Sequence, residues 1–504
     1  MTFIFEQSDT EIYASHADLV VAGPIINRHS GLKKRLKSIP LRHGIAHIDL
    51  VRTYLGLLCQ GKNDFEAVEG IRKDPFFQQA LGIGRVPSSA RLRQRFDEQA
   101  ETLIQAVDDC LAPMLANLCA TVTPMRTGHV ALHADVFCLD NSKTHKAGVA
   151  RTYHGYDGYA PIGAYLGEEG WCVGLELRPG DQHSQKDFPF FLDRVLPRAR
   201  QLAGDRKLLV TLDGAHDAAA NREQLSKEQV DYLIKWNPRG ESPEAWKERA
   251  ETEGRFEEVR PGKQVALFDE LIEWIFDGRT HQGRRVVRLI ERTEDRQGQP
   301  LLFPELTVEG WWTSLDAGTV DAQALITLYQ QRGTSEQYHS EFKTDLDLER
   351  LPSGKFETNA LVLTLAAMAY NILRYVGQNT LIGPDAPIRK ALHRRRIRTV
   401  MQEMMYKAVR LVRHGRRRVL RFGRGVIPAL RRWRVVTRTC WPSDRAVPVE
   451  QRLRERRRQI ALPACFWISR IASPVALPKH QFADPSRQIF DVMPITEAPA
   501  ESCR

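Results

Sequence analysis

A stretch beyond the middle of the chain carries four polar side chains at helical spacing. Tyr329, Arg332, Glu336 and Lys343 are separated by two, three and six intervening residues, which places them along one face of a helix. That face would present a hydroxyl, a guanidinium, a carboxylate and an ammonium. A carboxylate flanked by cations suits a site that holds a divalent metal and a phosphodiester together. A solvated helix with ion pairs between successive turns would show the same pattern.

A glycine interrupts this stretch. Because glycine costs about 1 kcal/mol inside a helix, Gly333 predicts two helices here, the second capped by Thr334 or Ser335. A helix over 321–331 leads into the stretch, and an apolar helix over 356–376 follows it.

Two aspartates stand at the ends of predicted strands upstream. Asp135 lies in a strand over 130–139, and Asp213 follows a buried strand over 207–212. Asp140, five residues beyond Asp135, begins a predicted turn and is the alternative first acid. Strands over 161–166 and 171–177, a helix over 188–202 and a helix over 218–225 complete the pattern. Three antiparallel strands, a helix, a strand and a helix form the order of a ribonuclease H-like core, so we expect an α/β (α+β, multidomain) fold.

The three acids define the chemistry of the predicted site. Asp135, Asp213 and Glu336 provide oxygen ligands without a thiol or imidazole cluster, a donor set that prefers Mg²⁺ or Mn²⁺ over zinc. With two such ions, one activates water or a 3′-hydroxyl and the other stabilises the leaving oxygen of an in-line displacement.

The spacing also matches a known family. Tyr329, Arg332, Glu336 and Lys343 fit the Tyr-(2)-Arg-(3)-Glu-(6)-Lys signature of bacterial insertion-sequence transposases of the DDE class, which this chain resembles. Residues 140–161 and 177–185 look like one group of those sequences. The resemblance implies that the acids bind the metals, that Arg332 and Lys343 grip phosphate oxygens, and that Tyr329 contacts DNA near the cut.

The resemblance further implies the partners and two alternatives. Such an enzyme binds double-stranded DNA, at the inverted ends of its element and at the target, and acts as a homodimer. The same site run with water alone would be a metal-dependent nuclease. Asp213-Gly-Ala-His216 departs from Asp-Ser-Gly-Phe, the commoner motif at the second acid of such transposases. A DNA-binding relic that has lost cleavage is therefore the third possible function.

The N-terminal part reads as a helical DNA-binding domain. Residues 1–30 look like a weakly structured lead-in, and helices are predicted over 45–58 and from Asn63 to Ile71. A glycine turn at 82–84 and a capped helix from 86 then resemble a helix-turn-helix. Three basic residues near the start of that last helix are the candidate DNA contacts: Arg91, Arg93 and Arg95.

The remaining boundaries follow from changes in pattern. We expect an N-terminal domain over 1–125, a catalytic core over 126–230 and 320–385, and a β-rich insertion of short strands over 231–319. A basic C-terminal region over 386–504 completes the chain. It contains arginine clusters at 394–396, 416–418, 431–432 and 452–458, and a hairpin around Gly415. The scarcity of acids over 389–434 favours a phosphate-binding surface.

Composition agrees with a polyanionic partner. The chain has 504 residues, a net charge of +11 and 42% hydrophobic residues, with a pI near 9.3. Its eight cysteines are scattered without metal-binding spacing and read as reduced thiols. The N-terminus lacks the pattern of a signal peptide, and the apolar run over 361–373 is too short to span a bilayer. We therefore expect no membrane segment and a bacterial cytoplasmic, nucleoid-associated protein.

Overall fold

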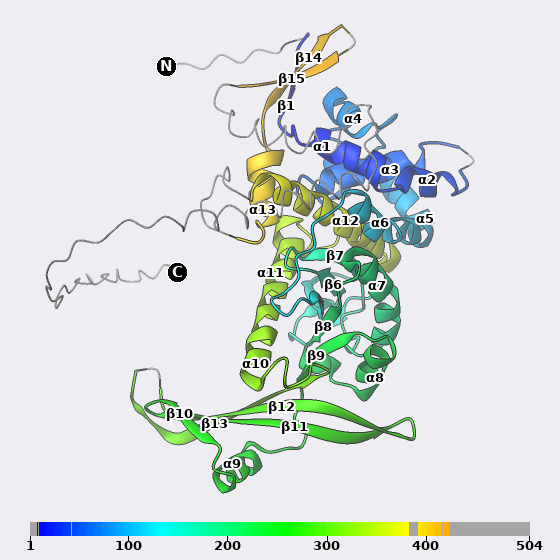
Figure 1. Cartoon of the computed structure of the whole chain (residues 1–504). Coiled ribbons are helices and arrows are strands. Elements are labelled where there is room, and N and C mark those ends of the chain that lie inside the picture. Colours follow the sequence, from blue (N-terminus) through cyan, green and yellow to red (C-terminus); the bar gives the residue numbers. More distant parts are fainter. Residues whose placement is uncertain are drawn as a thin grey trace, which may run out of the picture. The chain divides into compact units, whose positions relative to one another are not determined.

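The structure is a computed structural model, and it describes residues 8, 10–41, 43–295, 297–382, 392–415 and 417–423 (Figure 1). These residues lie in one compact unit. Helices of the N-terminal part and strands of the central sheet share a single hydrophobic cluster. The predicted domain boundaries at 125 and 319 therefore do not interrupt the core, and they stay predictions from sequence, while position 385 lies outside the described residues.

A nine-stranded sheet forms the centre, in the order β10-β11-β12-β13-β9-β8-β2-β6-β7. β2 pairs with β8 and β8 with β9 in parallel, whereas β2 with β6 and β6 with β7 run antiparallel. This order and direction over the five core strands is that of a ribonuclease H-like fold, which confirms the predicted fold class. The core strands are β2 (Val130–Val136), β6 (Ile162–Leu166), β7 (Trp171–Glu176), β8 (Leu208–Leu212) and β9 (Asp231–Trp236).

Two helices connect the parallel strands. α7 (Phe188–Ala203) links β7 to β8, and α8 (Ala219–Lys227) links β8 to β9. α7 buries one apolar face, and every residue of β8 is buried, as expected for a parallel strand covered on both faces. These elements agree with the sequence prediction to within two residues at each end.

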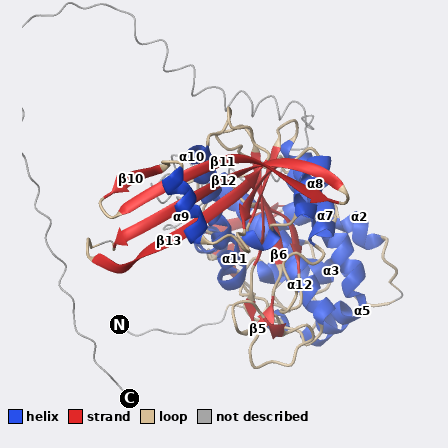
Figure 2. Ribbon diagram, turned by 90° about the horizontal axis from the view of Figure 1, so that it is seen from below, coloured by secondary structure: helices blue, strands red, loops and turns tan. Residues whose placement is uncertain are grey.

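The predicted β-rich insertion is wrong in its start and in its strand lengths. β9 lies within the range assigned to it, yet β9 pairs with β8 and belongs to the core sheet. Beyond β9 the insertion has long strands. β13 pairs with β9, so the insertion extends the same sheet (Figure 2). Its elements are α9 (Pro243–Thr252), β10 (Phe256–Arg260), β11 (Lys263–Phe276), β12 (Arg279–Glu294) and β13 (Pro300–Thr313).

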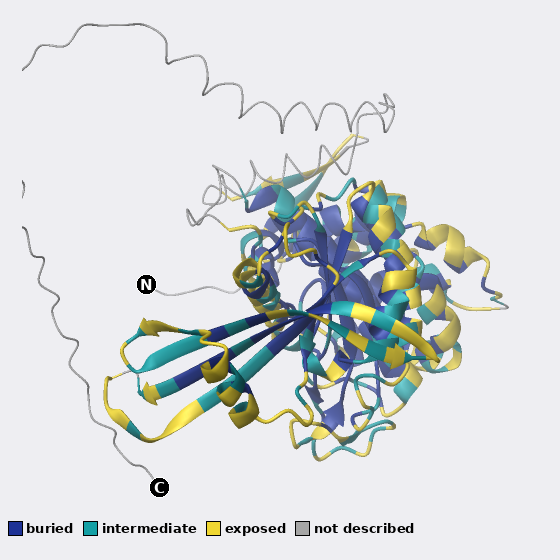
Figure 3. Cartoon of the chain, turned by 60° about the horizontal axis from the view of Figure 1, so that its bottom comes forward, coloured by how far each residue is buried: buried dark blue, intermediate teal, exposed yellow. Residues whose placement is uncertain are grey.

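Exposure of the insertion strands rises away from the core. The C-terminal half of β11 alternates between exposed and half-buried residues. By contrast, every residue of β6 and all but one of β2 are buried (Figure 3). A small sheet of β3 (Leu139–Asp140), β5 (Asp157–Tyr159) and β4 (Ala150–Arg151) follows β2.

The lead-in expected over residues 1–30 is wrong for its described part. Leu19, Ile25 and Ile26 are fully buried in the main cluster, and Ile12 to Ala14 pair with the strand β14 from the C-terminal part. Burial of these apolar side chains against later helices, invisible in a local pattern, stabilises the segment. Its elements are β1 (Ile12–Ala14), α1 (Leu19–Pro24) and the π-helical turn η1 (Ile25–His29).

The helices that follow agree in part with the prediction. The second helix, expected from Asn63 to Ile71, is only the short 3-10 turn η2. α5 is capped by Ser88, whose hydroxyl accepts from the Arg91 amide at 3.3 Å. The described elements are α2 (Leu32–Lys37), α3 (His47–Leu58), η2 (Phe65–Val68), α4 (Pro75–Leu81), α5 (Ser89–Asp108) and α6 (Leu111–Asn117).

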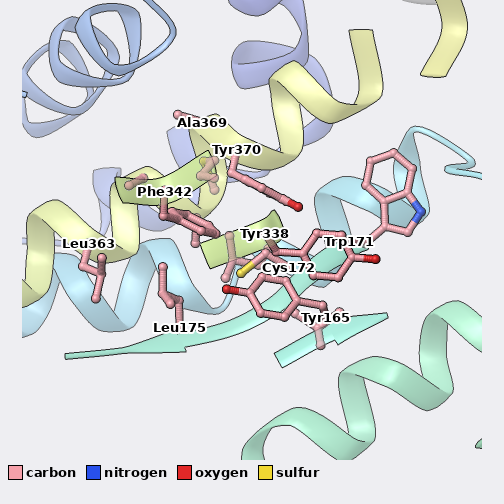
Figure 4. Close-up of a cluster of buried hydrophobic side chains, with 14 of the residues drawn as sticks. Tyr165, Trp171, Cys172, Leu175, Tyr338, Phe342, Leu363, Ala369 and Tyr370 are labelled. Carbon is pink, nitrogen blue, oxygen red and sulfur yellow. The ribbon is translucent and has the colours of Figure 1, made fainter. Parts of the chain in front are cut away.

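The apolar helix α12 (Phe356–Thr380) holds these parts together. It packs against α3 and α5 on one side and against β7 on the other. Figure 4 shows part of this core, in which the rings of Phe342 and Tyr370 stack at 4.6 Å and those of Tyr165 and Tyr338 lie 4.8 Å apart. Among the described helices α12 has the length and composition of a membrane span, but 94% of its most apolar window is buried inside the protein.

The stretch around Gly333 breaks as predicted, though without the predicted caps. α10 (Ala322–Gln330) passes through the 3-10 turn η4 (Gln331–Thr334) into α11 (Ser335–Ser340), and the π-helical turn η5 (Glu341–Asp345) follows. The hydroxyls of Thr334 and Ser335 donate backwards to the carbonyls of Gln331 and Arg332. They cannot cap α11, because the chain never leaves a helical conformation there.

The described C-terminal part begins with α13 (Ile397–Val400) and the π-helical turn η6 (Met401–Met405). The predicted hairpin is confirmed as β14 (Val409–His414) and β15 (Arg417–Phe422), with Gly415 at φ +58° in the turn. The arginine clusters at 431–432 and 452–458 lie outside the described residues.

Candidate active site

The central sheet brings two of the predicted acids together. In the parallel pair of β2 and β8, His133 is the partner of Thr211, so the same register sets Asp135 beside Asp213 two residues later. Both strands end at this edge of the sheet, where side chains leave the packed interior.

Asp135 is paired with an arginine. Its Oδ2 lies 2.9 Å from Nη2 of Arg332, and both side chains are almost buried, at 14% and 13% exposed. Its Oδ1 accepts from the Val136 amide at 3.0 Å. Burial raises the pKa of Asp135 and the nearby Asp213 carboxylate adds to the rise, while the Arg332 guanidinium opposes it.

Asp213 has a different partner. Its Oδ1 lies 2.6 Å from Nδ1 of the fully buried His216, so an imidazole protonated on Nδ1 donates to the carboxylate. Burial alone would raise the pKa of Asp213, but the hydrogen bond from His216 and the charge of Arg332 bring it below its ordinary value. Nε2 of His216 is buried without a hydrogen-bond partner among the described residues.

The break between α10 and α11 directs two signature residues towards these acids. Tyr329 donates its hydroxyl to the carbonyl of Leu212, at 3.3 Å, one residue before Asp213. Burial raises the pKa of Tyr329 to about 12. Arg332, one turn later, reaches Asp135. The sequence predicts one site for Tyr329, Arg332 and the two aspartates. The structure brings these four residues together.

Glu336 does not join them. It is exposed on α11, and among the described residues it forms no salt bridge or hydrogen bond. Within the described part of the chain no three His, Cys, Asp or Glu side chains gather closely enough to hold a metal ion. Glu336 follows Arg332 across the 3-10 turn η4, and its exposed side chain remains outside the pair of aspartates.

Lys343 lies in η5, half-buried, and lowers the pKa of two groups near the site. One is His339, whose pKa falls to about 3 because of burial and then the charges of Arg332 and Lys343. The ring of His339 stacks on Phe137 at 4.4 Å, and its Nε2 is buried without a hydrogen-bond partner among the described residues. The other is the thiol of Cys138, whose pKa is raised by burial, a rise that the charge of Lys343 partly opposes.

The sequence interpretation missed the roles of His216 and His339. His216 stood in the departing motif after Asp213, and that departure was the available signal. His339 lies three residues after Glu336, a spacing that brings the two side chains close on a helix. Nothing in the sequence shows that the His339 ring is buried against Phe137, the residue that follows β2.

Asp140 is engaged elsewhere. Its carboxylate accepts from the Ser142 amide at 2.8 Å, and its own amide donates to Glu349 at 2.8 Å. The hydrogen bonds with Ser142 lower its pKa. It closes the predicted turn, whereas Asp135 is the acid whose charge interacts with Asp213, so the geometry favours Asp135 as the first acid.

The candidate DNA-contacting arginines of α5 differ in exposure. Arg91 is exposed and donates to Gln94 at 3.1 Å. Arg93, 48% exposed, pairs with Glu66 at 3.2 Å and lies over the Phe65 ring. Arg95 is only 12% exposed, so the structure leaves Arg91 and Arg93 as the accessible pair.

The first arginine cluster of the C-terminal region is not a free phosphate-binding surface. Arg394 pairs with the buried Glu341 at 3.0 Å, and Arg396 with the buried Asp345 at 2.9 Å. Arg374 of α12 completes the pair on Glu341. These carboxylates pair with two arginines of the cluster and tie it to η5, the turn that follows α11, because a buried charge needs a partner.

The donor set can be tested against a divalent cation. Asp135 and Asp213 present carboxylate oxygens at one edge of the sheet, which suits Mg²⁺ or Mn²⁺. The Arg332 guanidinium stands on Asp135 and supplies the positive charge that the pair of acids requires. The two aspartates thus fit such an ion, provided that Arg332 moves off Oδ2.

Comparison with known proteins identifies the family of the chain. No curated protein shows significant sequence similarity to the chain. A solved structure of piggyBac transposase in a synaptic complex with hairpin DNA is similar with 11% identity and a TM-score of 0.36, covering 88% of this chain and 84% of that one. The family described as "Transposase DDE domain group 1" matches residues 30–438. The chain therefore belongs to the transposases with a DDE domain of group 1.

Proposed function

We propose that the protein is an insertion-sequence transposase of the Tyr-Arg-Glu-Lys group. It binds the terminal inverted repeats of its element as a homodimer, cleaves the DNA and joins the ends to a target. The observation that carries the proposal is the proximity of Asp135 and Asp213 at the ends of the parallel core strands β2 and β8. Arg332 and Tyr329 reach the same place from the α10–α11 break. We infer a bacterial cytoplasmic, nucleoid-associated location from the basic charge and the resemblance.

Each residue has a role in this proposal. Asp135, Asp213 and Glu336 hold two Mg²⁺ or Mn²⁺ ions, which supply the activation of the attacking oxygen and the stabilisation of the leaving oxygen. His216 fixes the orientation of the Asp213 carboxylate. Arg332 exchanges Asp135 for a phosphate oxygen when DNA binds, since a guanidinium binds phosphate with two parallel hydrogen bonds. Lys343, from the next turns, binds the phosphate backbone as a point charge.

The second candidate is a DNA-binding relic without cleavage. The specific observation in its favour is that both oxygens of Asp135 already have partners, while Glu336 remains exposed. A nuclease that uses water alone is the nearest enzymatic alternative. The three functions differ in their products: joined strands, cut strands only, or bound DNA only.

The experiment uses a labelled duplex that carries the terminal repeat of the element, with Mg²⁺, with Mn²⁺, and with EDTA. The wild type is compared with Glu336→Gln and Asp213→Asn. We expect cutting at the repeat end and joining to a second duplex by wild type alone, with DNA binding retained in both variants. If all three proteins bind equally and none cuts with either metal, the relic is the correct function.

A further inference from the structure

Three aromatic side chains form a row on the loop between β4 and β5. The ring centroids of Tyr153 and His154 lie 4.3 Å apart, and those of His154 and Tyr156 lie 5.9 Å apart with planes only 7° from parallel. Tyr153 is 64% exposed, and His154 is exposed as well. Tyr156, at the end of the row, is half-buried. Exposed aromatic side chains that gather in one patch, unlike single ones, mark a site of interaction.

The loop holds its own conformation. The amide and the hydroxyl of Thr152 both donate to the carbonyl of Tyr156, at 2.9 and 2.7 Å. The Gly155 amide donates to the Thr152 carbonyl at 2.9 Å, and Gly155 has a φ of +83° that favours glycine. The rings are therefore presented in a preformed arrangement, which reduces the ordering cost of binding.

This row adjoins the candidate active site. The Tyr153 ring faces solvent, but its hydroxyl turns inward and donates to the carbonyl of Val136 at 3.3 Å, one residue after Asp135. Burial of the hydroxyl, the thiol of Cys138 and the carboxylates of Asp135 and Asp213 together raise the pKa of Tyr153. The carboxylates of Asp135 and Asp213 thus lie close enough for their charges to affect the Tyr153 hydroxyl.

The charges around the row are mixed. Lys343 acts on the thiol of Cys138, which also interacts with Thr152 and Tyr153. Burial raises the pKa of Tyr156 to about 12, and the charges of Cys138, Glu349 and Asp140 contribute to the rise. Because acids offset the base here, any affinity of this surface rests on the rings more than on charge.

We propose that Tyr153, His154 and Tyr156 form a stacking platform for unpaired DNA bases next to the scissile phosphate. This inference rests on the proposed function, since it assigns the platform to the substrate strand of the same site. Aromatic rings stack on any base, so the platform would be tolerant of sequence. It would hold the strand end that the aspartates act on.

The test measures binding of a fluorescein-labelled twelve-nucleotide oligothymidylate to the full chain by anisotropy, in EDTA. For Tyr153→Ala we expect about tenfold weaker binding or more, since each stacked base contributes substantially to affinity. Tyr153→Phe, which keeps the ring and loses only the bond to Val136, is expected within about twofold of wild type by the same reasoning. Tyr13→Ala is the matched control, because Tyr13 is also 64% exposed but lies in β1.

Two results would overturn the platform. One is wild-type affinity in both Tyr153→Ala and His154→Ala. The other is an equal loss in Tyr153→Phe and Tyr153→Ala, which would show that the hydroxyl supports the fold and the ring binds nothing. The assay contains no metal, so it measures binding without cleavage. If the protein does not cleave DNA, the binding measurement can therefore still be interpreted. If the oligothymidylate does not bind, the result of the cleavage assay still stands.

Discussion

Replacing Arg332 tests how the site is held before metal and DNA arrive. The variant Arg332→Gln removes the partner of Asp135 from a pair whose side chains are 13% and 14% exposed. Removing one partner of a buried pair costs about 3–5 kcal/mol, and the residual exposure places our expectation near the lower end, at about 3 kcal/mol. The glutamine amide recovers little of this, because it carries no charge.

The loss should depend on pH, with a definite sign. Burial already raises the pKa of Asp135 in the folded state, so its contribution to stability is present at low pH and declines as pH rises through the folded value. Without Arg332 that pKa rises further. The stability difference between wild type and Arg332→Gln should therefore be small near pH 5 and largest near pH 8.

The assay is a double-mutant cycle of Arg332→Gln, Asp135→Asn and the double variant. Urea unfolding is followed by tryptophan fluorescence in EDTA at both pH values. We expect a coupling energy of about 2 kcal/mol or more near pH 8. A coupling below about 0.5 kcal/mol, the usual error of additivity, would refute the pairing. A loss that grows towards pH 5 would refute the electrostatic reasoning.

Three further predictions concern groups outside the site. Arg394→Gln should destabilise the protein by about 2–3 kcal/mol in urea unfolding, because Glu341 is 1% exposed and would lose a charged partner; an unchanged midpoint would contradict this. Asp18 is buried, neither of its oxygens has a hydrogen-bond partner within the described part of the chain, and burial raises its pKa to about 8. Wild type should thus lose about 1 kcal/mol per pH unit between pH 5 and 8, and Asp18→Asn should lack that slope. Gly170→Ala should lower the melting temperature by several degrees, because φ is +69° and the added carbon would meet Tyr338 at 2.4 Å; equal melting curves would count against it.

Local patterns in the sequence determined much of the core. Strands and helices from 130 to 227 are recognisable because their apolar runs and turn residues repeat at the periods that these elements impose. The hairpin at Gly415 follows from the conformational freedom of glycine, which has a φ of +58° in the turn. The break at Gly333 follows from the low helix propensity of glycine. The acids at the strand ends, and Arg332 one turn after Tyr329, were also readable by spacing.

Contacts between distant segments decided the rest. The core's fifth strand, β9, looks like any short strand until it pairs with β8, and residues 19–26 join the core only because later helices cover them. The arginines at 394–396 suggested a DNA surface, whereas Glu341 and Asp345, some fifty residues earlier, neutralise two of them. His216 and His339 acquire roles only where the fold buries them beside Asp213 and Phe137. A sequence shows which charges and rings exist, but their partners come from tertiary packing, because pairing energies depend on distance and burial.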